Sequence, residues 1–180
     1  MKILITGLGI TGKSTFRQLI AVQLQANNDK VVCLDLDYQR DQLPQEFDPD
    51  SIYILEDVHG PTPNAVIPIK SFDQIFYLQP GWLTHLRFWL SRMKIWFGNG
   101  KFGWDADKGE KGEWLGTGKP YDLANILPIL KDFWSHFKVR KQTIKNDLRV
   151  ISATGIDCIL IVPRKKWGKI KFFAYDFYRS

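Results

Sequence analysis

The sequence predicts a three-layer α/β fold, in which a parallel sheet is covered by crossover helices, and two observations carry that prediction. Short apolar runs alternate with segments of helical periodicity over the first half of the chain. This alternation is typical of βαβ units. The chain has 180 residues, of which 44% are hydrophobic and 24% charged, as expected of one globular domain with a substantial core. We therefore expect a single domain over residues 1–180.

Strands are predicted over four apolar runs, and an amphipathic helix follows the first of them. The runs are 2–6, 30–34, 51–55 and 73–78. Residues 41–50, rich in Asp and Pro, are expected to form a loop or a short helix. A second helix is predicted over 82–97, where apolar side chains recur at helical spacing: Trp82, Leu86, Trp89, Met93 and Trp96. Such an aromatic stripe is more typical of a core than of a platform for stacking bases.

The chain changes character after the second helix. Residues 98–120 are rich in glycine and lysine and predict a long loop, inserted like a lid. A third helix is expected over 122–147, with Pro128 near its first turn. Its Lys131, Lys138 and Lys145 form a stripe that is typical of a solvated face. Residues 148–180 predict a C-terminal antiparallel β meander, with strands over 150–153, 158–162 and 170–178, which we expect to extend or flank the parallel sheet.

The junction of the first strand and first helix fits the pattern G-x-x-x-x-G-K-[ST], a phosphate-binding loop. Glycine lets the backbone approach an anion closely, and the helix N-terminus attracts negative charge. We expect Lys13 to reach the β- and γ-phosphates and Ser14 to offer a hydroxyl to Mg²⁺. The alternative is a glycine-rich turn that binds nothing. The predicted phosphate-binding residues are Gly7, Leu8, Gly9, Ile10, Thr11, Gly12, Lys13, Ser14 and Thr15.

Four acidic residues follow the predicted second and third strands: Asp35, Asp37, Glu56 and Asp57. In an open parallel sheet, ligands bind at the carboxyl ends of the strands, where the loop after the first strand also lies. We expect Asp35 or Asp37 to be catalytic, and Glu56 or Asp57 to hold a metal ion with Ser14. Any single one of these acids could instead cap a helix or a turn.

The net charge of +6 is unevenly distributed. Residues 1–80 contain 6 Lys/Arg and 10 Asp/Glu, and residues 81–180 contain 19 and 9. An acidic half with a phosphate loop and a basic half suit a polyanionic ligand between them, although the basic half could also be a solvated surface.

The two cysteines lie in apolar, strand-like runs without metal-ligand spacing, which favours buried thiols in a reducing compartment. Glycines and Lys13 interrupt the apolar N-terminus, so we expect no secretion signal. No uncharged apolar stretch is long enough to span a membrane. We therefore expect a cytoplasmic protein. The scattered histidines, His59, His85 and His136, are expected to be structural, and His59 is worth testing because it follows the acid pair.

With these motifs, the sequence resembles the P-loop NTPases and, among them, the small-molecule kinases. Leu34 to Arg40 resembles adenylylsulfate kinases in its Leu-Asp-x-Asp-x-x-Arg spacing. The resemblance implies ATP and Mg²⁺ as cofactors, and a hydroxyl or phosphate acceptor that Arg40 would bind. It also implies that residues 98–120 close over the phosphates. That segment lacks arginine, so the cations would come from Lys101, Lys119 or the flanking Arg87, Arg92 and Arg140.

Two other functions remain open. The basic second half would suit a polynucleotide 5′-kinase or a nucleic-acid-associated ATPase. Residues 57–60, Asp-Val-His-Gly, fit the D-x-x-G pattern of a GTPase switch, but no Asn/Thr-Lys-x-Asp follows to recognise guanine.

Overall fold

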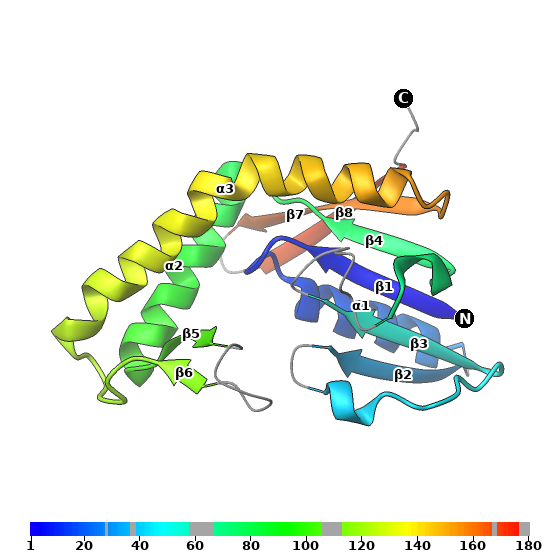
Figure 1. Ribbon diagram of the computed structural model, residues 1–180, viewed down its shortest axis with the longest axis horizontal. Helices are drawn as coiled ribbons and strands as arrows, with labels where there is room; N and C mark the ends of the chain where they lie inside the picture. The colour runs from blue at the N-terminus through cyan, green and yellow to red at the C-terminus, as the bar shows by residue number, and fades with distance from the viewer. Residues whose placement is uncertain (28, 37–38, 58–66, 106–112, 167–168, 177–180) are drawn as a thin grey trace.

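The computed structural model describes residues 1–27, 29–36, 39–57, 67–105, 113–166 and 169–176, and its main feature is a mostly parallel sheet (Figure 1). Among these residues the sheet has six strands, in the order β2-β3-β1-β4-β7-β8. Every neighbouring pair is parallel except β7 and β8. The strands are β1 Lys2–Gly7, β2 Lys30–Asp35, β3 Ser51–Glu56, β4 Gln74–Leu78, β7 Cys158–Lys166 and β8 Lys169–Asp176. The four strands predicted in the first half of the chain are confirmed.

Helices cover both faces of the sheet, because the buried strands are apolar on both sides. On one face Phe16 and Ala21 of α1 (Lys13–Gln25) pack against Ile3 and Ile5 of β1. On the other face α3 (Ile126–Ser152) packs against a cluster that includes Leu4. Successive residues of β1 thus face opposite helices, as the two-residue period of a strand requires. The α/β class is confirmed.

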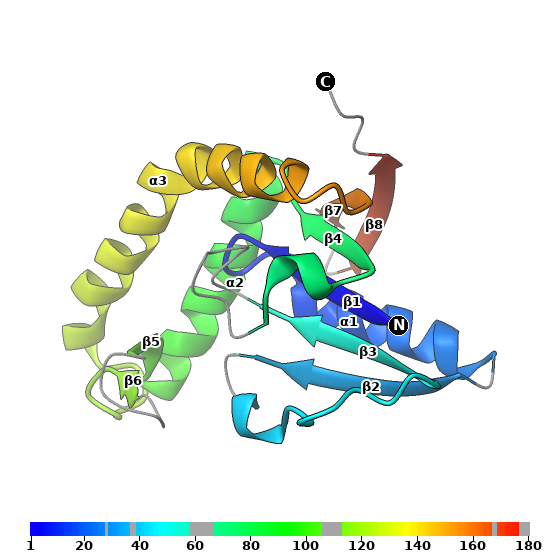
Figure 2. The same ribbon diagram turned by 45° about the vertical axis from the view of Figure 1, so that its right-hand side comes forward.

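The remaining long helix, α2 (Trp82–Asn99), packs against α3 through the aromatic stripe. Trp89 is fully buried and Trp96 nearly so, as predicted. Trp82 is 60% exposed, so its prediction as a core residue is wrong. It occupies the first position of α2. Both views show that α3 bends, so its N-terminal half follows α2 and its C-terminal half follows the sheet (Figures 1 and 2).

The prediction of a long loop over residues 98–120 is partly wrong. Its two ends pair as antiparallel strands, β5 (Phe102–Asp105) and β6 (Glu113–Leu115). Residues 106–112 between them lie outside the described part of the chain. Gly100 ends α2 with φ 68°, and a Cβ there would meet the Lys119 carbonyl oxygen at 2.1 Å. Glycine is therefore required where this ribbon leaves the helix.

The predicted C-terminal meander does extend the main sheet, but its first strand is wrong. Residues 150–152 end α3, because Ile144 and Ile151, both buried, continue its helical spacing against the sheet. β7 is then parallel to β4 and belongs to the main sheet, since α2 and α3 provide the crossover that a parallel pair needs. The antiparallel pairing that was expected is limited to β7 and β8.

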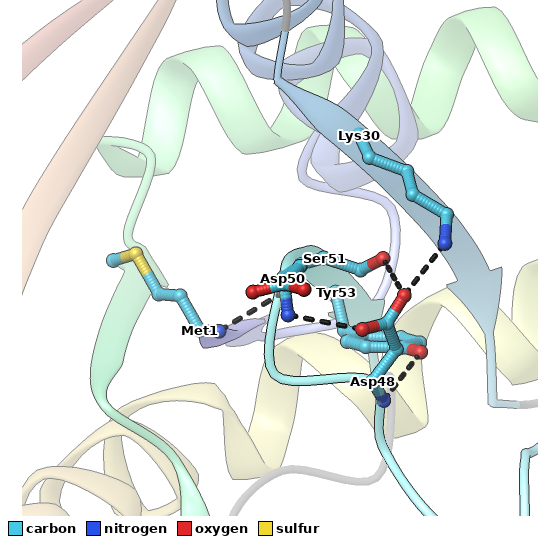
Figure 3. Close-up of polar contacts among 6 residues, drawn as sticks. All are labelled: Met1, Lys30, Asp48, Asp50, Ser51 and Tyr53. Carbon is cyan, nitrogen blue, oxygen red and sulfur yellow. Dashed lines mark hydrogen bonds and ion pairs between the residues drawn. The ribbon is translucent and has the colours of Figure 1, made fainter.

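A polar cluster around Asp48 fastens the amino ends of β2 and β3 (Figure 3). Its carboxylate accepts hydrogen bonds from Lys30 Nζ at 2.6 Å and from Ser51 Oγ at 2.8 Å. These bonds lower the pKa of Asp48 to about 2. The N-terminal ammonium donates to the Ser51 carbonyl beside it. The cluster lies at the end of the strands opposite to the predicted site. Its hydrogen bonds connect β2, β3 and the N-terminus, so its role is structural.

Two further expectations concern the cysteines and the membrane. Cys33 is half-buried and Cys158 is buried, and both are free thiols. Within the described residues, none of the helices combines the length and the apolar character needed to cross a bilayer.

Candidate functional site

The loop between β1 and α1 lies at the carboxyl end of the central strand and is wound tightly. Gly7, Ile10 and Gly12 have φ values of 130°, 56° and 86°, all in the region that favours glycine. A Cβ on Gly7 would lie 2.5 Å from the Leu78 carbonyl oxygen of the neighbouring strand β4. The first glycine of the motif is thus required both for its φ angle and for the close approach of β4.

The loop curls around the side chain of Lys13, which is 3% exposed. Its ammonium donates to the carbonyl oxygens of Gly7 at 3.2 Å and Leu8 at 2.8 Å. The Leu8 carbonyl also accepts a hydrogen bond from Thr11 Oγ1 at 3.0 Å. A positive charge therefore lies inside the loop, at the N-terminus of α1, where the helix dipole also favours an anion.

Next to the loop, the Ser14 hydroxyl donates to Glu56 Oε1 at 2.9 Å. Glu56 ends β3 and is 3% exposed, and Asp57 after it is 7% exposed. Burial raises the pKa of Glu56, although Lys13 and Ser14 oppose that shift. The second carboxylate oxygen, Oε2, is buried and accepts no hydrogen bond from a described residue. The cation nearest to Oε2 is Nε of Arg17, at 3.5 Å.

Arg17, which was not among the predicted site residues, lies between two of the predicted acids. Asp35 and Glu56 are paired in register at the ends of β2 and β3. The guanidinium of Arg17 lies 3.9 Å from Asp35 Oδ2 and 3.5 Å from Glu56 Oε2. A shared cation lets the two carboxylates stay close. The available signal was spacing, because Arg17 follows Ser14 by three residues and so shares its side of α1.

The opposite side of the loop is held by His85, which was expected to be structural, and by Arg140, which was expected to serve the acceptor or the lid. His85 of α2 and the Gly9 carbonyl oxygen are 2.9 Å apart at Nε2, and Arg140 of α3 donates from Nε to His85 Nδ1 at 3.2 Å. Because a guanidinium can only donate, Nδ1 accepts, and Nε2 carries the proton that His85 donates to Gly9. Burial lowers the pKa of His85 to about 4, so the ring is neutral near pH 7. Two helices therefore fix the position of the loop.

A scan against models of protein families and a search of curated proteins each gave no match to this chain.

The remaining predicted residues are not gathered at the loop. Arg87 donates to the Lys165 carbonyl oxygen at 3.2 Å, and Arg92 lies 6.0 Å from the centre of the Trp96 ring. Of the three arginines that flank the predicted lid, Arg140 is the one that contacts His85, which in turn bonds to the loop. Asp37, His59 and the side chain of Arg40 lie outside the described residues.

A metal ion could be held at one place in this site. The part of the chain that the structure describes has no group of three or more His, Cys, Asp or Glu side chains suited to a metal. Mg²⁺ needs no such group, because it commonly takes one or two carboxylates and fills its other positions with phosphate and water oxygens. Ser14, Glu56 and Asp57 offer hard oxygen donors of that kind.

Proposed function

We propose that this chain is an ATP-dependent phosphotransferase of the P-loop kind. It would move the γ-phosphoryl group to a hydroxyl or phosphate of a small molecule, with a nucleoside or nucleotide as the favoured acceptor class. The observation that carries the proposal is the buried Lys13 ammonium inside a loop of positive φ angles, beside the Ser14–Glu56 pair. Cation, hydroxyl and carboxylate together match what a bound triphosphate and its metal require.

The position of the loop supports the same proposal. β1 lies between β3 and β4, so the chain fills the sheet on one side of β1 and then on the other. In open α/β sheets, ligands bind at the carboxyl ends of the strands where the order reverses in this way. Both ribbon views show these ends of β1, β2 and β3 turned toward the side of the molecule that carries α2 and the β5–β6 ribbon (Figures 1 and 2).

In the proposed complex, Lys13 and the backbone amides of residues 7–15 bind the phosphates. The ammonium would exchange its bonds to the Gly7 and Leu8 carbonyls for bonds to phosphate oxygens. His85, held by Arg140, keeps the loop in place from behind. A preorganised loop binds an anion without first ordering itself, which favours both affinity and rate.

Ser14, Glu56 and Asp57 would hold Mg²⁺, and the contact between the Ser14 hydroxyl and Glu56 Oε1 already brings two of these oxygen donors together. The ion would neutralise charge on the transferring phosphoryl group. Asp35 is the proposed residue that orients or deprotonates the acceptor, and Arg17 positions its carboxylate. The β5–β6 ribbon, which replaces the predicted lid loop, would exclude water.

The test is nucleotide binding and ATP turnover by Lys13→Ala, with Lys70→Ala as a matched control, because Lys70 is exposed on a 3-10 turn remote from the loop in sequence. We expect Lys13→Ala to lose the Mg²⁺·ATP-induced rise in melting temperature, and its turnover, while its circular dichroism stays unchanged. A variant that keeps full binding and turnover contradicts the proposal. A Mg²⁺-dependent rise with GTP but not ATP would favour a GTPase switch instead.

A thermal-shift screen of nucleosides, nucleotides, sugars and small acids, with a non-hydrolysable ATP analogue and Mg²⁺ present, identifies the acceptor. A ligand that binds the folded state raises the melting temperature by mass action. If the analogue alone gives a shift that no candidate acceptor increases, the site acts as an ATPase rather than as a small-molecule kinase.

A further inference from the structure

The outward side of α3 carries a row of cations. The helix has 3.6 residues per turn, which places these side chains within about 80° of one another around its axis. At 1.5 Å per residue they extend over about 27 Å, measured along the axis of the bent helix. All of these residues are exposed. The members of this α3 basic face are Lys131, Lys138, Lys141, Lys145 and Arg149.

No carboxylate neutralises the α3 basic face among the described residues. α3 has two acids, Asp132 and Asp147, and both point away from it. Asp147 accepts a hydrogen bond from the Tyr77 hydroxyl of β4 at 2.8 Å, so it faces the sheet. Asp132 lies 3.7 Å from Nδ1 of His136 on its own helix and is half-buried. The positive charges are thus left to the solvent side and the negative ones are turned inward.

An aromatic side chain interrupts the row of cations. Trp134 is 68% exposed and lies within the same 80° sector, between Lys131 and Lys138. Both views place this helix at the edge of the molecule, with α2 and the sheet on its inner side (Figures 1 and 2). A large exposed aromatic ring among cations is suited to stacking on a base while the cations contact phosphates.

We propose that the α3 basic face binds the sugar-phosphate backbone of a nucleic acid. A row about 27 Å long is longer than any single small anion, and it matches about eight nucleotides at 3.4 Å each. Residues 138–149 form the C-terminal half of the face. The large hydrophobic residue exposed in this stretch is Val139, which lies outside the 80° sector of the cations. That half therefore offers little apolar surface for insertion into a membrane, which an interfacial helix needs.

This inference does not rest on the proposed phosphotransfer, because binding is measured without nucleotide. The probe is a fluorescein-labelled oligonucleotide of about 16 nucleotides, twice the span of the face, as single-stranded DNA, single-stranded RNA and duplex DNA. Its anisotropy is followed during titration with the full chain at several salt concentrations. We expect affinity to fall steeply with salt, because each neutralised phosphate releases counterions.

The deciding variant is Lys141→Glu/Lys145→Glu, and its matched control is Lys70→Glu/Lys94→Glu, which changes the net charge equally at exposed positions elsewhere. We expect the first variant to bind roughly tenfold or more weakly, with a salt slope lower by about 2, and the control to change far less. All four side chains are exposed, so circular dichroism and melting temperature should match those of the original chain.

Equal losses in the two double variants overturn the proposal, because net charge alone would then explain binding. Absence of binding to every oligonucleotide also overturns it, as does binding to vesicles with anionic lipid but not to nucleic acid. Trp134→Ser distinguishes the form bound. Stacking on unpaired bases predicts a loss of roughly fivefold or more on single strands and a small change on duplex.

Discussion

The loop around Lys13 and the outer side of α3 are both positively charged, but the charge is buried in the loop and exposed on the helix. Lys13 is 3% exposed and bonded to two carbonyl oxygens, while the α3 basic face is exposed and has no carboxylate partner in the described structure. Burial fixes the position of a charge and strengthens its field at one point. Exposure spreads charge along a surface, where salt screens it. The first arrangement suits one small anion, and the second suits a long one.

The buried region should be the more sensitive to substitution, and Gly7→Ala gives the largest effect. The new Cβ would meet the Leu78 carbonyl oxygen at 2.5 Å and sit at a φ of 130°. We expect a loss of about 3 kcal/mol or more in the free energy of unfolding.

Two matched variants separate the causes of that loss. Gly155→Ala has a φ of 78° but open space, and should cost about 1 kcal/mol. Gly81→Ala has open space and no positive φ, and should stay within about 0.5 kcal/mol. Urea denaturation measures all three. Equal losses would show that the close approach of β4 to the loop is not a constraint.

The second largest effect concerns pH and the group behind the loop. Burial lowers the pKa of His85 to about 4 in the folded chain, from the ordinary histidine value of 6.5. The unfolded chain therefore binds the proton more readily, and stability is complete above pH 6.5 and falls as pH decreases toward 4. The full loss is roughly 3 kcal/mol.

Denaturant unfolding between pH 4 and 7 tests this, with His85→Gln as the comparison. Glutamine can still donate an amide hydrogen to the Gly9 carbonyl, but it does not titrate. Other groups contribute equally to both proteins, so the difference between the two curves isolates the ring. If the free energy of unfolding depends on pH in the same way in both proteins, the pKa of His85 is not lowered by folding.

A smaller effect is expected where α3 meets the sheet. Tyr77→Phe removes the hydroxyl that donates to Asp147 and leaves that half-buried carboxylate without its donor. We expect a loss of about 1–3 kcal/mol. Tyr121→Phe, at a residue that is 70% exposed, serves as control and should change stability little. Thermal unfolding compares them, and a Tyr77→Phe variant as stable as the control would contradict the contact.

The smallest effect should come from the exposed surface of α3. Leu127 and Trp134 are 77% and 68% exposed, so Leu127→Gln and Trp134→Gln should alter stability by about 0.5 kcal/mol or less. Ile129→Ala in the same helix removes a side chain that is 2% exposed and should cost about 2–4 kcal/mol. A large loss at Leu127 or Trp134 would show that this surface is covered in solution.

The sequence predicted best what is decided locally. The loop from Gly7 to Ser14 requires its glycines at fixed places, and Asp35 and Glu56 end strands whose apolar runs are unambiguous. The α/β class followed from the same runs. The membership of the chain in the P-loop group and the roles of its acids stay predictions.

Contacts between distant segments could not be predicted in this way. Arg140 and His85 are 55 residues apart, and no spacing rule connects two helices that meet only after folding. The parallel pairing of β7 with β4 was not predicted for the same reason, because it depends on the α2–α3 crossover and not on the composition of the strand. Residues 150–152 were mistaken for a strand because Val150 and Ile151 are β-branched, while packing against the sheet kept them helical.

β8, the one antiparallel strand of the main sheet among the described residues, decides which strand lies at the border of that sheet. It pairs with β7 from Ile159–Asp176 to Lys166–Lys169, and so covers the backbone of a strand rich in Ile, Leu and Val. An uncovered apolar strand of that length is a template for edge-to-edge aggregation. β8 replaces it at the border of the sheet with a strand that exposes Lys169 and Lys171 and also Phe173 and Tyr175. The hairpin thus moves the open edge of the sheet from β7 to β8, which a further parallel strand could do only with another long crossover.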